Sequence, residues 1–301
     1  MPVVTLRDKY EQFFTELTNA SKASAKIDEN CIYQEANPGT RKYMNYLLKD
    51  NMLEGSSLGN IELFKAFYDA VTKDGKTGVI MMEHYSNMDL PIFLYLLENY
   101  GEEWAKDFAS RVVAIAGMKL NEANDGVGAF TEGFTRVVIY PTRSIQALKD
   151  KGAAPEIIEE EEKRARKINF AAMRAMDECK KRGEIILVFP SGTRYRPGKP
   201  ETKRGLRELD SYLRLFDIML PVSINGCCLH INPENPDDML ADIVKPEVVT
   251  MTASNIVECK PFRKNILENL PADCPDPKQV TVDAVMAIMD KTHEQVEKER
   301  K

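Results

Sequence analysis

The segment TGVIMMEHYSNMDLPIFLYLLENYG, residues 77–101, decides the fold class of this chain. Its first part, TGVIMMEH, is a short apolar run of the length expected for a β-strand that is buried on both faces. Its last part, LPIFLYLLENYG, reads as a helix. A buried strand that leads directly into a helix is the building unit of α/β proteins.

The same alternation continues along the chain and predicts an α/β fold with a mixed, largely parallel sheet flanked by helices. A long helix is expected at 158–183, with acidic residues early, basic residues late and a glycine at its end, as the helix dipole and C-capping favour. A late strand at 248–260 and an amphipathic helix at 280–301 complete the prediction. The remaining buried strands are expected at 111–117, 135–141, 184–190 and 218–225.

The N-terminal part of the chain has a different pattern. Apolar residues at helical spacing predict helices at 6–20, 41–53 and 61–75, and a break rich in Gly and Ser falls at 54–60. We therefore expect residues 1–58 to form a small N-terminal helical appendage and residues 59–301 to form the α/β domain. The alternative is that these helices simply pack on the main sheet.

Length, charge and composition argue against several classes of protein. The 301 residues suffice for a full core, and the net charge of −6 argues against nucleic acid as a partner. The sequence contains no apolar run of about 18 residues, so no membrane-spanning helix is expected. The N-terminus does not follow the pattern of a secretory signal. The six cysteines are scattered, which predicts reduced thiols in a cytoplasmic protein without a metal site.

His84, one of three histidines, is the first candidate catalytic residue. It follows an apolar run and precedes Asp89 by five residues. This spacing does not pair two side chains on one face of a helix, but a strand-to-helix turn can bring them together. A carboxylate bonded to one ring nitrogen would fix the tautomer and leave the other nitrogen to accept a proton from a hydroxyl. The alternative is a core histidine beside an aspartate that only caps the helix.

A reversal of charge follows the strand expected at 184–190. Six basic residues and one acid fall between residues 194 and 207, although the chain as a whole is acidic. A loop of this kind concentrates anions, and the guanidinium groups of Arg194 and Arg196 suit the oxygens of a phosphate. Arg143, after another expected strand, adds a further cation. Loops that follow parallel strands meet at the sheet edge where ligands bind. The alternative is a solvated basic loop.

Two motifs together resemble the glycerolipid acyltransferase superfamily. The first is H-x4-D, from His84 to Asp89, and the second is F-P-S-G-T-R at 189–194. Most members of the superfamily have glutamate where this second motif has serine. The serine, the R-x-R that ends at Arg196 and the helical N-terminal region are most similar to the soluble, plastid-type glycerol-3-phosphate acyltransferases.

The likeness extends over roughly residues 75–230. FTEGFTRVVIYPTRSI at 130–145 is similar to the second motif of that family, and LPVSI at 220–224 resembles the fourth. This chain departs from the family near the end of the second motif. A basic residue followed by histidine is replaced there by Arg143-Ser144.

The resemblance implies an activity, glycerol-3-phosphate O-acyltransferase. A fatty acyl group would move from a thioester of acyl carrier protein or coenzyme A to glycerol 3-phosphate and give lysophosphatidate, the first step of phospholipid synthesis. His84, oriented by Asp89, would be the general base. No cofactor is implied beyond the thioester co-substrate. Peripheral contact with a membrane is compatible with this activity, and so is a plastid stroma if the chain is a mature organellar form.

The resemblance also assigns residues around the base. Backbone N–H groups near Ser191 and Gly192 would stabilise the oxyanion or position the substrate. The cations expected to hold the phosphate are Arg143, Arg194 and Arg196, with Lys203 and Arg204 as secondary contacts.

Three alternatives stay open. A serine hydrolase could use His84, Asp89 and Ser191, which occur in the chain order His–Asp–Ser, although Ser191 lies in P-S-G and not in a G-x-S-x-G elbow. A superfamily member could instead act on lysophosphatidate or another lysolipid, but such enzymes usually carry an apolar membrane segment. A non-catalytic phosphate- or lipid-binding module would not need the His84–Asp89 pair.

Overall fold

The computed structural model describes residues 3–22, 27–118 and 125–300. The chain divides into two compact units, each built from separate segments. The first unit contains Met1–Lys9, Asn45–Val112 and Gly183–Lys301, and the second contains Tyr10–Met44 and Val113–Arg182. Helices α1 (Leu6–Ala20) and α2 (Pro38–Asn51) cross from one unit to the other. Residues 1–58, expected to form an appendage, therefore contribute to both units.

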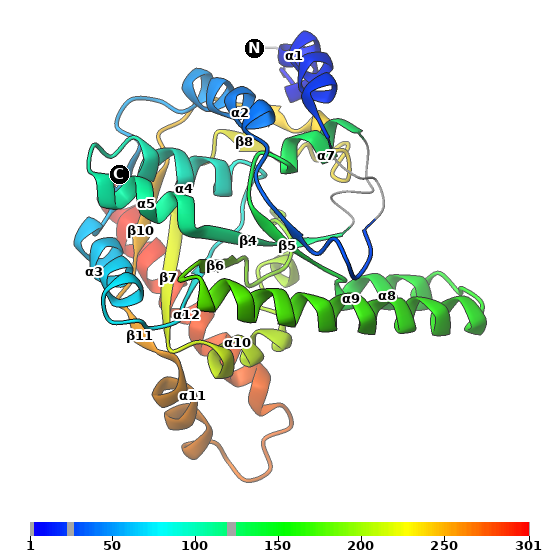
Figure 1. Ribbon diagram of the computed structural model, residues 1–301, viewed down its shortest axis with the longest axis vertical. Helices are drawn as coiled ribbons and strands as arrows, with labels where there is room; N and C mark the ends of the chain where they lie inside the picture. Colours follow the sequence, from blue (N-terminus) through cyan, green and yellow to red (C-terminus); the bar gives the residue numbers. More distant parts are fainter. Residues whose placement is uncertain (1–2, 23–26, 119–124, 301) are drawn as a thin grey trace. The chain divides into compact units, whose positions relative to one another are not determined.

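The fold is mixed α/β with mostly parallel strands, as the sequence predicts (Figure 1). In the first unit the strand order is β6–β3–β7–β10–β2, and β11 also pairs with β7. Strand β3 is parallel to both β6 and β7, whereas β10 is antiparallel to β7 and parallel to β2. The strands of this unit are β2 (Ser57–Gly59), β3 (Gly78–Met82), β6 (Ile185–Val188), β7 (Ile218–Asn225), β8 (Leu229–His230), β9 (Ile243–Val244), β10 (Thr250–Ala253) and β11 (Val257–Glu258).

Helices cover the strands of the first unit. Helix α12 contacts β7, and α3 approaches the start of β3. A Cβ atom on Gly78 would lie 2.6 Å from Phe67 and 2.8 Å from Val71, so only glycine allows α3 to pack this closely. The helices are α3 (Ile61–Thr72), α4 (Asp89–Glu98), α5 (Glu103–Arg111), α10 (Asp210–Leu215), α11 (Cys259–Glu268) and α12 (Pro277–Glu299), with 3-10 turns η1 (Pro200–Thr202), η2 (Arg207–Leu209) and η3 (Met239–Ala241).

The core of the first unit lies around its three parallel strands. Every residue of β3, β6 and β7 is buried. Strands covered on both faces are rich in apolar residues, which explains why these three segments could be recognised from sequence. Their carboxyl ends lie at one edge because the strands run in the same direction, and the site described below is built there.

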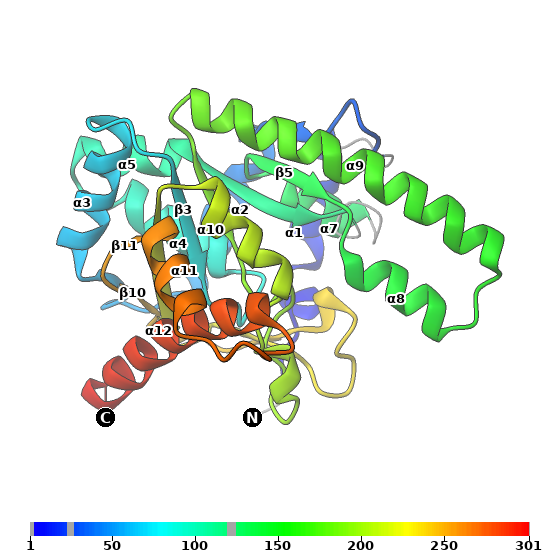
Figure 2. The same ribbon diagram turned by 90° about the horizontal axis from the view of Figure 1, so that it is seen from below.

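The second unit contains three of the strands. Strand β5 (Arg136–Ile139) pairs in parallel with β4 (Val112–Gly117) and antiparallel with β1 (Tyr33–Gln34). The long helix α9 (Pro155–Lys181) packs on β5, and α8 (Thr142–Asp150) lies beside α9 (Figure 2). Helix α7 (Asp125–Thr131) completes the unit.

The structure differs from the sequence-based expectation at the edges of the sheet. The segment 54–60, expected to be a break, contains β2, and the expected late strand at 248–260 is divided into β10 and β11. Strands of two to four residues are too short to show a periodic pattern. All six cysteines are free thiols. Within residues 3–22, 27–118 and 125–300, no helix combines the length and apolar character needed to cross a bilayer.

Candidate active site

His84 lies just beyond the carboxyl end of β3, in the turn that leads into α4. Asp89 is the first residue of α4 and is buried. The Nδ1 atom of His84 lies 2.9 Å from Oδ2 of Asp89. The same carboxylate oxygen accepts hydrogen bonds from the backbone N–H groups of Tyr85, at 2.7 Å, and Ser86, at 2.9 Å. The strand-to-helix turn therefore pairs the two residues that a continuous helix would separate.

This pairing determines the tautomer of the histidine. An ionised carboxylate can only accept hydrogen bonds, so the proton of a neutral His84 resides on Nδ1. The Nε2 atom then carries a lone pair and makes no hydrogen bond with the described residues. The His84 side chain keeps 16% of its surface exposed, against 4% for Asp89. In this arrangement the carboxylate fixes Nδ1, and Nε2 is able to accept a proton.

The loop after β6 contacts the histidine directly. The ring of Phe189 stacks on the ring of His84, with centroids 4.0 Å apart and planes inclined by 16°. The backbone N–H of Tyr195 donates to the carbonyl oxygen of His84 at 2.7 Å. The H-x4-D and F-P-S-G-T-R segments, about a hundred residues apart in sequence, therefore lie against each other.

Ser191 and Gly192 lie in a tight turn of the same loop. The N–H of Gly192 donates to the carbonyl oxygen of Phe189 at 2.9 Å, so this amide is already engaged within the turn. Gly192 has a φ of 62°, a left-handed conformation that favours glycine, and a Cβ atom there would also lie 2.5 Å from the end of the Leu206 side chain. The hydroxyl of Ser191 donates to the carbonyl oxygen of Thr193 at 2.6 Å. The hydroxyl thus supports the loop.

Arg194 and Arg196, two of the three expected phosphate ligands, differ in their surroundings. Arg194 is buried and forms an ion pair with Asp242, whose side chain is fully buried. Burial raises the pKa of Asp242 to about 6, although the Arg194 charge opposes this change. Arg196 is 30% exposed and pairs at 3.0 Å with Asp237, which is itself 88% exposed. An incoming anion can displace Asp237 at little cost, whereas Asp242 is held firmly against Arg194.

Acids from other segments face most of the remaining basic loop. Lys203 contacts Asp290 at 2.6 Å and Glu83 at 3.6 Å, and its side chain is 33% exposed. Burial lowers the pKa of Lys203, but its contacts with these two acids outweigh that effect, and the pKa is raised overall. Arg204, 64% exposed, lies 3.9 Å from Asp283. The strong positive charge that the local sequence indicates is therefore partly compensated in three dimensions.

Arg143, the third expected phosphate ligand, belongs to the second unit. It is the second residue of α8, after the carboxyl end of β5. Its part in phosphate binding stays a prediction.

A buried cluster around Glu83 was not anticipated from the sequence. Its Oε2 atom accepts from the backbone N–H of Ile224, at 2.8 Å, and contacts Nδ1 of His293 in α12 at 2.9 Å. The hydroxyl of Tyr85 donates to Oε1 at 3.0 Å. The hydrogen bond with Glu83 raises the pKa of His293, and burial together with the Glu83 charge raises the pKa of Tyr85. A charged residue at the end of a wholly apolar strand is the clue that could have revealed this cluster.

A small cavity lies beside the histidine. Its volume is about 10 Å³, which holds about one water molecule. A molecule larger than water therefore reaches the ring only through its exposed edge or after the basic loop moves. The cavity is lined by Met82, Glu83, His84, Tyr85, Pro190, Ser191, Tyr195, Lys203 and Met286.

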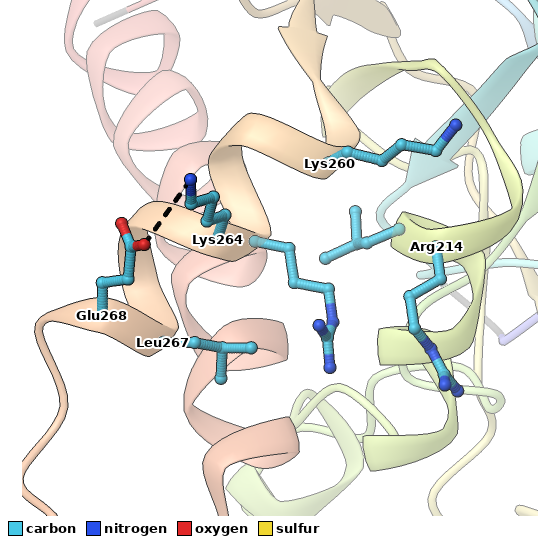
Figure 3. A pocket seen from close by; sticks show the side chains of 7 residues that line it. Arg214, Lys260, Lys264, Leu267 and Glu268 are labelled. Atoms are coloured by element: carbon cyan, nitrogen blue, oxygen red, sulfur yellow. Dashed lines mark ion pairs between the residues drawn. The ribbon is translucent and has the colours of Figure 1, made fainter.

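A larger hollow of about 460 Å³ lies between α10 and α11 (Figure 3). Helix α10 leads into the first residue of β7. Strand β11 pairs with that same end of β7, and α11 follows β11 directly. The hollow therefore lies at the opposite end of the strands from His84. Its cations are matched by acids: Arg263 binds the buried Asp210, and Lys264 points toward Glu268. The hollow is lined by Leu213, Arg214, Lys260, Arg263, Lys264, Leu267 and Glu268. It has no arrangement suited to catalysis, so size alone does not mark the site.

Comparison with known proteins adds no family assignment. No protein-family model matches the sequence, and a search of curated proteins finds no significant relative.

Proposed function

We propose that the protein is an acyltransferase that moves a fatty acyl group from a thioester of acyl carrier protein or coenzyme A to glycerol 3-phosphate. The observation that carries this proposal is the hydrogen bond between His84 Nδ1 and Asp89 Oδ2, formed where β3 ends. The contact of this turn with the F-P-S-G-T-R loop supports it further, because the two motifs that resemble the family are brought together.

In the proposed reaction His84 acts on the acceptor hydroxyl. The free Nε2 lone pair takes the hydroxyl proton while the oxygen attacks the thioester carbonyl, and Asp89 stabilises the imidazolium that forms. Collapse of the tetrahedral intermediate expels the thiolate, which takes up the proton from His84. Oxygen thus gains the acyl group, sulfur gains the proton, and the base returns to its starting state.

Arg196 is the best placed of the described arginines to bind the acceptor phosphate. Its partner Asp237 is a solvated surface carboxylate, and exposed ion pairs of this kind contribute about 1 kcal/mol or less. A phosphate dianion offers a stronger, bidentate contact to guanidinium. Free glycerol should for the same reason be a poor acceptor.

The test is direct. Purified protein is incubated with glycerol 3-phosphate and a long-chain acyl thioester, and release of free thiol is followed. We expect turnover in the native protein and in His230→Ala, a matched control at an exposed histidine, and its loss in His84→Ala. Turnover retained by folded His84→Ala would contradict the assignment of the general base.

The same assay separates the serine hydrolase alternative. The Ser191 hydroxyl donates to the Thr193 carbonyl oxygen and makes no hydrogen bond with His84 among the described residues. We expect Ser191→Ala to keep considerable activity. Complete loss, together with an acylated Ser191 in the native protein by mass spectrometry, would favour the hydrolase instead. If the protein used a lysolipid in preference to glycerol 3-phosphate, it would instead be a lysolipid acyltransferase of the same superfamily.

A further inference from the structure

The outward face of α9 carries a surface that the proposed reaction does not use. The helix packs on β5 through a buried stripe that includes Ala165, Ile168, Ala172 and Met176. On the opposite side, Phe170 is 64% exposed and Met173 is 51% exposed. These two residues are three positions apart, so their side chains lie next to each other on one helix face.

Basic residues surround this apolar pair. Arg166, Lys167 and Arg174 are exposed and lie three or four positions from Phe170, on the same face. Lys167 and Arg174 form no ion pair with another described residue. From residue 163 to 181 the helix has seven basic and two acidic residues, in a chain of net charge −6. We call Arg166, Lys167, Phe170, Met173 and Arg174 the α9 patch.

The acids of α9 lie toward the two ends of the helix, where Glu162 and Asp177 flank the α9 patch. Five glutamates fall between residues 156 and 162, in the first turns of the helix. Lys163 pairs with Glu159, and farther along Lys180 pairs with Asp177. Lys167 and Arg174 therefore stay without an ion-pair partner among the described residues.

We propose that the α9 patch docks the protein on an anionic lipid bilayer. Helices that lie at a bilayer surface combine apolar side chains, which enter the headgroup region, with Lys and Arg that approach anionic lipids. Phe170 and Met173 supply the first part, and the three cations supply the second. Charge complementarity selects an anionic surface, and a contiguous, exposed aromatic and thioether pair suits a fluid surface. This inference stands independently of the acyl-transfer proposal.

The expected binding is moderate and depends on salt. Each Lys or Arg near an anionic membrane surface contributes about 1 kcal/mol to binding. Three such cations therefore strengthen binding about a hundredfold. This attraction is screened at about 1 M salt, where the Debye length falls to about 3 Å. Insertion of the apolar pair is much less sensitive to salt, so the two contributions can be measured separately.

The experiment is co-sedimentation of the full chain with vesicles. One set contains equal parts of phosphatidylglycerol and phosphatidylcholine, and the other contains phosphatidylcholine alone. The variants are Lys167→Glu/Arg174→Glu for the charges and Phe170→Ser/Met173→Ser for the apolar pair. The matched control is Lys73→Glu/Lys264→Glu, which makes the same charge change at exposed lysines of the first unit. Circular dichroism checks that each variant is folded.

We expect the native protein and the control to bind the anionic vesicles and to bind neutral vesicles at least tenfold less. The charge variant should lose about a hundredfold or more in affinity, and the apolar variant about tenfold. Failure of the native protein to bind anionic vesicles overturns the proposal. So does equal binding to both vesicle types, or unchanged binding by the two patch variants. The proposal would also be overturned if the native protein did not bind vesicles but self-associated, or bound purified acyl carrier protein, and the patch variants lost that interaction.

Discussion

Replacement of Arg194 by alanine should destabilise the protein by an amount that depends on pH. The change removes the guanidinium that pairs with the fully buried carboxylate of Asp242. Breaking a buried ion pair by removal of one partner costs about 3–5 kcal/mol, because an uncompensated charge is left behind. We therefore expect the free energy of unfolding of Arg194→Ala to fall by about that amount at pH 8, where Asp242 is ionised.

The pH dependence follows from the pKa of Asp242, which burial raises from 3.8 to about 6. A folded-state pKa above the unfolded value means that the protonated group favours the folded state. Its contribution is fully present below pH 3.8 and is lost as the pH rises through about 6. The loss is about 3 kcal/mol for a shift of about two units. At pH 5 most of Asp242 is protonated and needs its cation less, so Arg194→Ala should cost less there than at pH 8.

Urea unfolding at pH 5 and pH 8, followed by circular dichroism, measures both effects. The control is the double variant Arg194→Leu/Asp242→Leu, which removes both charges and should be more stable than Arg194→Ala at pH 8. An equal loss at both pH values would refute the reasoning, as would a double variant no more stable than the single one. In either case the Arg194–Asp242 ion pair would not be the origin of the effect.

Three further predictions concern the candidate site. Asp89→Asn should lower kcat by about 10⁴-fold, because an amide can donate to Nδ1 of His84 and favour the wrong tautomer. The thiol-release assay measures kcat, and a near-native value would exclude the role given to Asp89. Arg196→Ala should raise the KM for glycerol 3-phosphate about ten- to a hundredfold and leave the KM for the thioester unchanged. Lys199→Ala is the control and should alter neither KM. If only the KM for the thioester changed, the acyl donor would bind at this loop instead. Glu83→Gln should bring the pKa of His293 down toward its usual value, because the hydrogen bond with the Glu83 carboxylate is weakened. NMR titration measures this pKa, with His230 as an internal control. An unaltered His293 titration would show that Glu83 does not raise the pKa of His293.

Much of the fold could be predicted because its central strands are buried on both faces. The segments around β3, β6 and β7 are rich in apolar residues, and each is followed by a Gly, Pro or polar break. The His84–Asp89 hydrogen bond could be anticipated for the same reason, since a buried strand that ends just before a helix leaves few ways to place the turn. Edge strands such as β2 could not be predicted, because three residues paired by tertiary contact carry no pattern of their own.

The charge environment was harder to predict than the positions of the residues. Local sequence shows six bases in the loop 194–207, but Asp237, Asp242, Asp283 and Asp290 approach it from segments that follow later in the chain. Long-range pairing of this kind has no sequence period. Glu83 was overlooked likewise, because its partners His293 and Lys203 lie far along the chain. The sequence locates the arginines, whereas only the structure shows which of them is available to a ligand.

The segmented make-up of the first unit has a consequence for synthesis on the ribosome. Strand β3 emerges early, but its neighbours β6 and β7 follow only after residues 113–182 have been translated. Until then the turn that holds His84 has no Phe189 ring to stack on and no Tyr195 amide to bind its carbonyl oxygen. Contacts so distant in sequence slow folding and prolong the exposure of apolar strands. The nascent chain therefore carries β3 without these neighbours until β6 and β7 have been translated, and it should depend on chaperones that shield apolar segments.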